Sequence, residues 1–110
     1  MRSRHTTDFL RDLVLLRNDP EKVGEIEREA YTDNPHAQYA MGLIYVEGRG
    51  VEPDRARAYA WLTLAVMNGD REAETLRNVV GAELTEEEYQ TGKALAGKLA
   101  AQISGGKTDH

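Results

Sequence analysis

With 110 residues, 40% of them hydrophobic and 30% charged, the chain has the length and composition of one soluble domain with a real core. A formal net charge of −5 argues against binding to nucleic-acid phosphates, and the absence of cysteine excludes disulfides and thiol chemistry. No apolar run reaches membrane-spanning length and no signal-peptide core follows residues 1–4, so we expect a cytoplasmic protein without membrane insertion.

The first 34 residues are predicted to contain two helices. Residues 1–5 are expected to be a flexible end, followed by a first helix over residues 6–17 with a broad apolar face. Asp19 can cap a second helix, which starts at Pro20 and runs to about residue 32. We expect the acidic outer face of this helix to be solvated, with docking of a basic partner as the alternative. Its carboxylates are those of Glu21, Glu25, Glu27 and Glu29.

The centre of the chain, residues 37–69, is predicted to form two helices joined by a short loop. Gly48 suits a left-handed helix end, Gly50 allows a second reversal, and Pro53 marks the entry to the next helix. So short a loop makes the two helices antiparallel neighbours. Apolar residues recur at three- and four-residue spacing in both segments, namely Ala37, Met41, Ile44 and Tyr45 in the first and Ala58, Trp61, Leu62, Ala65 and Val66 in the second.

Small residues lie in the middle of both central helices. A glycine inside a helix costs about 1 kcal/mol relative to alanine, so close packing is the expected reason for Gly42. We expect Gly42 to face Ala58 where the two backbones cross.

The last third is predicted to hold two more helices. Asp70 can cap a fifth helix that runs to about Val80 and is terminated by Gly81. Thr85 and Glu88 match a capping box for a last helix, which reaches residue 103. Residues 104–110 are expected to be a disordered tail. The side chains of the last helix that we expect to be buried are Tyr89, Leu95, Ala96, Leu99 and Ile103, with Gly92 allowing close packing.

Ten positions of the central segment together resemble the Sel-one-like repeat, a family of the tetratricopeptide-like class. The resemblance implies an all-α fold, a short α-α superhelix or solenoid of about three antiparallel helix pairs. Residues 35–69 would be a full repeat, residues 6–34 a degenerate repeat, and residues 70–103 a degenerate repeat with a capping helix, all within one domain over residues 6–103. The ten positions are Ala37, Met41, Gly42, Tyr45, Gly48, Gly50, Ala58, Trp61, Ala65 and Gly69.

Few residues have a pattern that points to catalysis. No pair among His5, His36 and His110 has the spacing of metal ligands on a helix, so no metal is expected. The segment around Arg49 lacks the lysine and the preceding strand that a phosphate loop needs. We therefore expect no cofactor and no enzymatic activity.

One stripe of the central segment is predicted to bind a partner. His36, Tyr39, Leu43 and Val46 are expected to point into the concave side of the arc, where apolar stripes recognise helices or extended peptides. Packing of Tyr39 and Leu43 on a neighbouring helix is the alternative.

Two functions are compatible with this stripe. We favour an adaptor or scaffold that binds a peptide or helix of a bacterial partner protein, and the alternative is a module that self-associates as a homodimer. A basic rim beside the loop is predicted to contact an acidic partner, with solvated side chains as the alternative; it consists of Arg49, Arg55 and Arg57.

Overall fold

The structure, a computed structural model, describes residues 19–107, and the regular elements of this range are all α-helices. The predicted all-α class is thus confirmed for the described part of the chain. The flexible end predicted for residues 1–5 and the helix predicted for residues 6–17 fall outside the described range. In chain order the helices are α2 (Pro20–Ala30), α3 (Pro35–Glu47), α4 (Arg55–Met67), α5 (Arg71–Glu83) and α6 (Glu86–Lys107).

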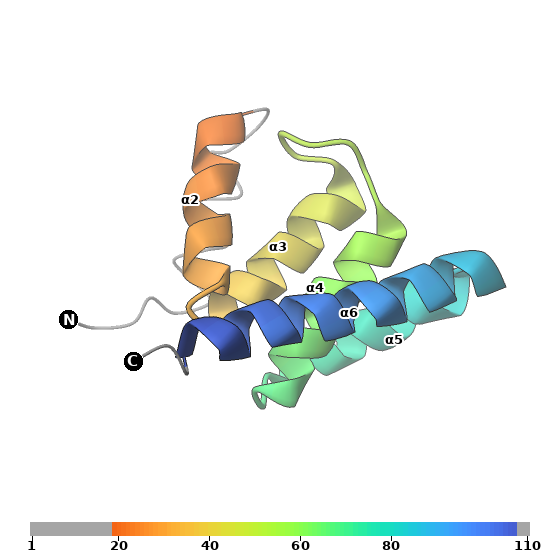
Figure 1. Cartoon of the computed structure of the whole chain (residues 1–110). Helices are drawn as coiled ribbons and strands as arrows, with labels where there is room; N and C mark the ends of the chain where they lie inside the picture. Colours follow the sequence, from red (N-terminus) through yellow and green to blue (C-terminus); the bar gives the residue numbers. More distant parts are fainter. Residues whose placement is uncertain (1–18, 108–110) are drawn as a thin grey trace.

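From α2 to α5, helices that follow one another in the chain pack on one another, as in a solenoid of helix pairs. The helix α2 lies against α3, α3 against α4, and α4 against α5, while α6 returns to pack on α4. Figure 1 shows the long α6 crossing the middle of the molecule in front of α4. The helix α4 therefore contacts three others and forms the centre of the described fold.

The helix starts are set by local capping. The side chains of Asp19, Asn34, Asp54 and Asp70 accept hydrogen bonds from first-turn amides of α2, α3, α4 and α5. Each such cap contributes about 1 kcal/mol. Before α6, the Thr85 amide donates to Glu88 Oε1 at 2.9 Å and the Glu88 amide donates to Thr85 Oγ1 at 3.0 Å. The predicted caps at Asp19, Asp70 and Thr85 are thus confirmed.

The loop between α3 and α4 depends on glycine, as predicted. Gly48 ends α3 in the left-handed region at φ 74°, and Gly50 has φ 77°. A Cβ atom at Gly48 would lie 2.6 Å from Pro53 Cγ, so conformation and space both exclude a side chain there.

Buried side chains form two clusters on opposite sides of α4. Trp61, with 1% of its surface exposed, lies in the larger cluster, and its ring meets that of Tyr31 edge-on with centroids 5.3 Å apart. The smaller cluster, between α4 and α5, comprises Leu62, Ala65, Ala73 and Val80. The larger cluster comprises Val23, Ile26, Ala30, Ala37, Ala40, Met41, Ile44, Ala60, Trp61, Leu64, Ala96, Leu99 and Ile103.

Gly42 packs closely on α4, but its neighbour is not the one predicted. A Cβ atom at Gly42 would lie 2.5 Å from Leu62 Cδ2 and 2.6 Å from Leu62 Cγ. The glycine therefore makes room for a buried leucine side chain. Ala58 is also fully buried.

Two predicted boundaries near the C-terminus are wrong. Gly81 does not terminate α5, which continues through Glu83; a Cβ atom at Gly81 would lie 3.1 Å from Tyr59 Cε1, so the glycine serves packing. The helix α6 continues through Lys107, where we expected a disordered tail from Ser104. Ile103, only 6% exposed, anchors its last turns to the core.

Candidate functional site

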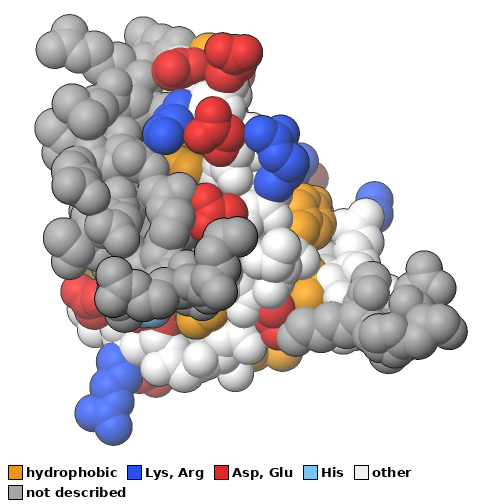
Figure 2. All heavy atoms as spheres, turned by 90° about the vertical axis from the view of Figure 1, so that its left-hand side faces the viewer, with side chains coloured by type: hydrophobic (Ala, Val, Ile, Leu, Met, Phe, Trp, Pro, Cys, Tyr) orange, Lys and Arg blue, Asp and Glu red, His pale blue; other side chains and the backbone are white. Residues whose placement is uncertain are grey.

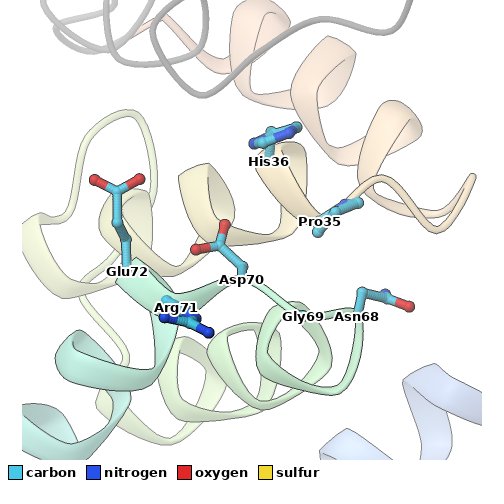
Figure 3. Close-up of a pocket in the computed structure, with 7 residues that line it drawn as sticks. All are labelled: Pro35, His36, Asn68, Gly69, Asp70, Arg71 and Glu72. Atoms are coloured by element: carbon cyan, nitrogen blue, oxygen red, sulfur yellow. The ribbon is translucent and has the colours of Figure 1, made fainter.

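A groove between α3 and α5 is the best candidate for a binding site. It consists of two adjoining hollows that share Glu72, and we call it the α3–α5 groove. The first hollow has a volume of about 340 Å³ and the second about 390 Å³. The first is lined by Pro35, His36, Asn68, Gly69, Asp70, Arg71 and Glu72 (Figure 3), and the second by Tyr39, Glu72, Thr75, Leu76 and Val79.

The second hollow has an apolar floor that is open to solvent. Tyr39 and Leu76 are half-buried and pack on the cluster between α4 and α5. Val79 is 55% exposed, although Leu76 and Val80 of the same helix are more buried. An exposed valine beside a half-buried tyrosine and leucine offers apolar surface that a partner could cover.

The first hollow has a negatively charged end. In Figure 3 the side chains of Asp70 and Glu72 project toward the side on which His36 lies, whereas the Arg71 guanidinium lies on the other side of the backbone. Burial raises the pKa of the Tyr39 phenol above its usual value, and the charges of Glu72 and Asp70 raise that pKa further. The phenol is therefore a neutral hydrogen-bond donor at physiological pH, next to two carboxylates.

Asp70 has two roles at this end of the groove. Its Oδ1 accepts the Ala73 amide at 3.0 Å and so caps α5. Its Oδ2 is buried and meets no hydrogen-bond donor among residues 19–107. A buried carboxylate oxygen without a donor favours the approach of a cationic group.

The structure brings together two of the four residues predicted to bind a partner. His36 and Tyr39 line the groove. Leu43 packs against the larger cluster and Val46 against the smaller one, and neither lines one of the two hollows. Leu43 thus contributes to the margin of the core.

The arginines of the predicted basic rim make ion pairs within the chain. Arg49 pairs with Glu47, and Arg55 pairs with Glu88 of α6 at 3.3 Å, which places the Arg55 side chain toward α6. Their contact with an acidic partner stays a prediction.

The third arginine of the rim has two contacts. Arg57 lies 3.7 Å from Asp54, and its guanidinium stands over the Tyr45 ring at 5.5 Å from the centroid. Exposed pairs of this kind contribute at most about 1 kcal/mol, so they would not prevent binding of a partner.

A polar network beside the groove was not predicted from the sequence. Gln38 is fully buried, and its Nε2 donates to Ala30 O at 3.1 Å and to Asp33 Oδ1 at 3.3 Å. Asn68 Nδ2 donates to Asp33 Oδ1 at 2.8 Å and to Gln38 Oε1 at 3.0 Å. The network ties the end of α4 to α3 and so fixes the turn that carries Asp70. Its only signal in the sequence was a glutamine among the buried positions of α3.

The outer face of α2 carries charges of both signs. Figure 2 views the molecule from this side and shows carboxylates interspersed with lysine and arginine side chains. Lys22 and Glu25 form an ion pair at 3.4 Å. A mixed surface of this kind is typical of a solvated face.

The described residues contain neither a metal-binding group nor a membrane-spanning helix. Among residues 19–107 no three histidine, cysteine, aspartate or glutamate side chains are grouped so that they could hold a metal ion. None of the helices described is both long enough and apolar enough to span a bilayer.

Comparison with known proteins identifies the central segment. Residues 35–70 match the family model of the Sel1 repeat. A stretch of 59 residues is 36% identical to the alginate biosynthesis protein AlgK of Azotobacter vinelandii, and the match covers 54% of this chain and 13% of that protein. No solved structure matches the chain. Residues 35–70 are therefore a Sel1 repeat, formed by α3, α4 and the loop between them, and such repeats generally mediate contacts between proteins.

Proposed function

We propose that this Sel1-repeat chain is an adaptor, without catalytic activity of its own, that binds a peptide or helix of a partner protein in the α3–α5 groove. The observation that carries the proposal is the solvent-exposed apolar floor formed by Tyr39, Leu76 and Val79. One wall of the groove is the first helix of the Sel1 repeat, and the other wall is the helix that follows the repeat.

The shape of the groove suits an elongated ligand. The two hollows share Glu72 as a lining residue, and a ligand that lies along α5 would pass both. Amphipathic helices and extended peptides bind in this manner, with one or two apolar anchors that supply most of the affinity. Tyrosine is enriched at such contacts because its ring is large and its hydroxyl group can donate a hydrogen bond.

Affinity capture with matched variants tests the proposal. We expect Tyr39→Ala and Val79→Ser to lose a partner protein that the wild-type chain recovers from a lysate of its native cells. Met67→Ser is the control, because Met67 is 68% exposed at the end of α4 and lines neither hollow of the groove. Equal recovery with all four proteins would refute binding in the groove. A circular dichroism spectrum of each variant shows whether the fold is retained.

Self-association is the alternative function. A stable homodimer usually buries a large and mostly apolar area of about 2,000 Å² or more. The exposed large apolar side chains of residues 19–107 are Tyr31, Met67 and Val79, and they lie on or at the ends of three different helices. This separation favours a foreign partner over a second copy. A dimer in light scattering that Val79→Ser dissociates would reverse that preference.

A further inference from the structure

We infer that the ligand of the α3–α5 groove is a basic amphipathic helix, with two apolar side chains one turn apart that fill the hollow beside Tyr39 and lysine or arginine side chains about one turn beyond them on either side. This inference rests on the proposed function and concerns the chemistry of the ligand. It is carried by the order of charged and apolar side chains along α5.

One face of α5 carries two apolar positions between two acidic ones. Glu72, Leu76, Val79 and Glu83 follow one another at spacings of four, three and four residues, which places them on one face of the helix. Glu72 and Glu83 are exposed. The apolar pair in the groove is therefore flanked by a carboxylate on each side.

These carboxylates have no cationic partner in the described structure. Asp70, Glu72 and Glu83 make no ion pair with any of residues 19–107. Arg71 projects away from Asp70 and Glu72 (Figure 3). Burial raises the pKa of Tyr59 and the charge of Arg77 partly offsets this rise, which places Arg77 near Tyr59 of α4. The groove thus offers negative charge that a ligand can neutralise.

The dipole of α5 does not cancel this charge. The start of a helix carries the equivalent of about half a positive charge. Asp70 and Glu72 together bring two negative charges to the same end, so the field in the first hollow stays negative. The Oδ2 atom of Asp70, buried beside this hollow without a donor among the described residues, adds to the negative field there.

The spacing of the carboxylates sets the length of the ligand. Glu83 lies eleven positions after Glu72, which corresponds to about 16 Å along a helix. A ligand helix that lies beside α5 therefore needs cations about three turns apart and apolar residues between them. This pattern is the complement of the face that α5 presents.

Selection from a library of random peptides displayed on phage tests the inference without knowledge of the natural partner. The bait is the full wild-type chain, and a second bait is the double variant Glu72→Lys/Glu83→Lys. We expect the wild-type chain to enrich peptides with apolar residues at i and i+4 and with lysine or arginine on both sides. The double variant should enrich acidic peptides instead, because its groove has the opposite charge.

Titration of the best peptide by fluorescence anisotropy gives the magnitudes. Glu72→Gln or Glu83→Gln should weaken binding about two- to fivefold at low salt and less at high salt. Tyr39→Ala should weaken it by about tenfold or more. Met67→Ser should leave the dissociation constant unchanged.

The outcomes separate this inference from the proposed function. Peptides that need Tyr39 but show no charge preference would overturn the basic ligand and retain the groove as a binding site. If no enriched peptide depends on Tyr39 or Val79, both proposals fail. A dimer that Val79→Ser dissociates, or a synthetic peptide of residues 1–18 that displaces the selected peptide, would assign the groove to this chain itself and also overturn the inference.

Discussion

Replacement of Gly42 by alanine tests the contact on which the packing of α3 against α4 depends. The added Cβ atom would lie 2.5 Å from Leu62 Cδ2, well inside van der Waals contact. Leu62 is fully buried in the cluster between α4 and α5, so its side chain has little free space to move into. One of the two helices must then shift, or Leu62 must adopt a poorer rotamer.

Two effects of opposite sign decide the result. Alanine gains about 1 kcal/mol over glycine inside a helix, whereas overpacking of a core costs about 1–3 kcal/mol. Gly97 in α6 isolates the first effect, because it is exposed and a Cβ atom there meets no atom within 4 Å. We therefore expect Gly97→Ala to stabilise the fold by up to about 1 kcal/mol and Gly42→Ala to lie about 1–3 kcal/mol below it.

Urea denaturation, followed by circular dichroism and by Trp61 fluorescence, measures both variants. A difference of 1 kcal/mol corresponds to about 4 °C in the melting temperature of a domain of this size. The double variant Gly42→Ala/Leu62→Ala should lose less stability than the sum of its single variants, because the new methyl group occupies part of the space that Leu62 leaves. Equal stabilisation by Gly42→Ala and Gly97→Ala would refute the close contact.

Three further predictions concern the core, the buried network and the last helix. Trp61→Ala should cost about 3–5 kcal/mol in urea denaturation, and a loss below about 1 kcal/mol would contradict the central position of Trp61. Gln38→Ala should cost about 1–3 kcal/mol, because Asn68 loses a buried acceptor; unchanged stability would mean that water replaces the amide. The Thr85 amide, with help from the Arg55 guanidinium, holds the pKa of Glu88 below its usual value. Since that folded-state pKa is depressed, the stabilisation exists at neutral pH and is lost as the pH falls through it. Glu88→Gln should therefore lower the urea midpoint at pH 7 but hardly at about pH 3, and an equal effect at both would exclude this linkage.

Local signals predicted most of the helix boundaries. Asp19, Thr85 and the glycines of the central loop act through hydrogen bonds and backbone conformations within a few residues, so the sequence alone contains their effect. Gly81 shows the limit of this reasoning. Its role is set by Tyr59 of α4, more than twenty residues away in the chain, and not by the conformation of its own neighbours.

Only the α3 side of the groove contains residues that were predicted from the sequence, because the groove needs two helices that are distant in the chain. His36 and Tyr39 could be placed on the exposed face of α3 from the helical period. Val79 could not, because the sequence alone does not show which face of α5 turns toward α3. Leu43, four residues after Tyr39, packs against the larger cluster, which is the alternative that the sequence left open for it.

The residue at position 70 links the stability of the fold to the proposed ligand. Asn34 caps α3 in the same manner as Asp70 caps α5, and the two residue types are about equally good caps, so capping alone does not require a charge at position 70. The charge gains about 0.3–1 kcal/mol from the helix dipole, but an ionised oxygen that is buried without a donor among the described residues costs more than the neutral amide nitrogen that would replace it. Asp70→Asn should therefore leave the urea midpoint unchanged or raise it, while it weakens the binding of a basic peptide. A clear loss of stability with unchanged binding would show that this carboxylate serves the fold and not the ligand.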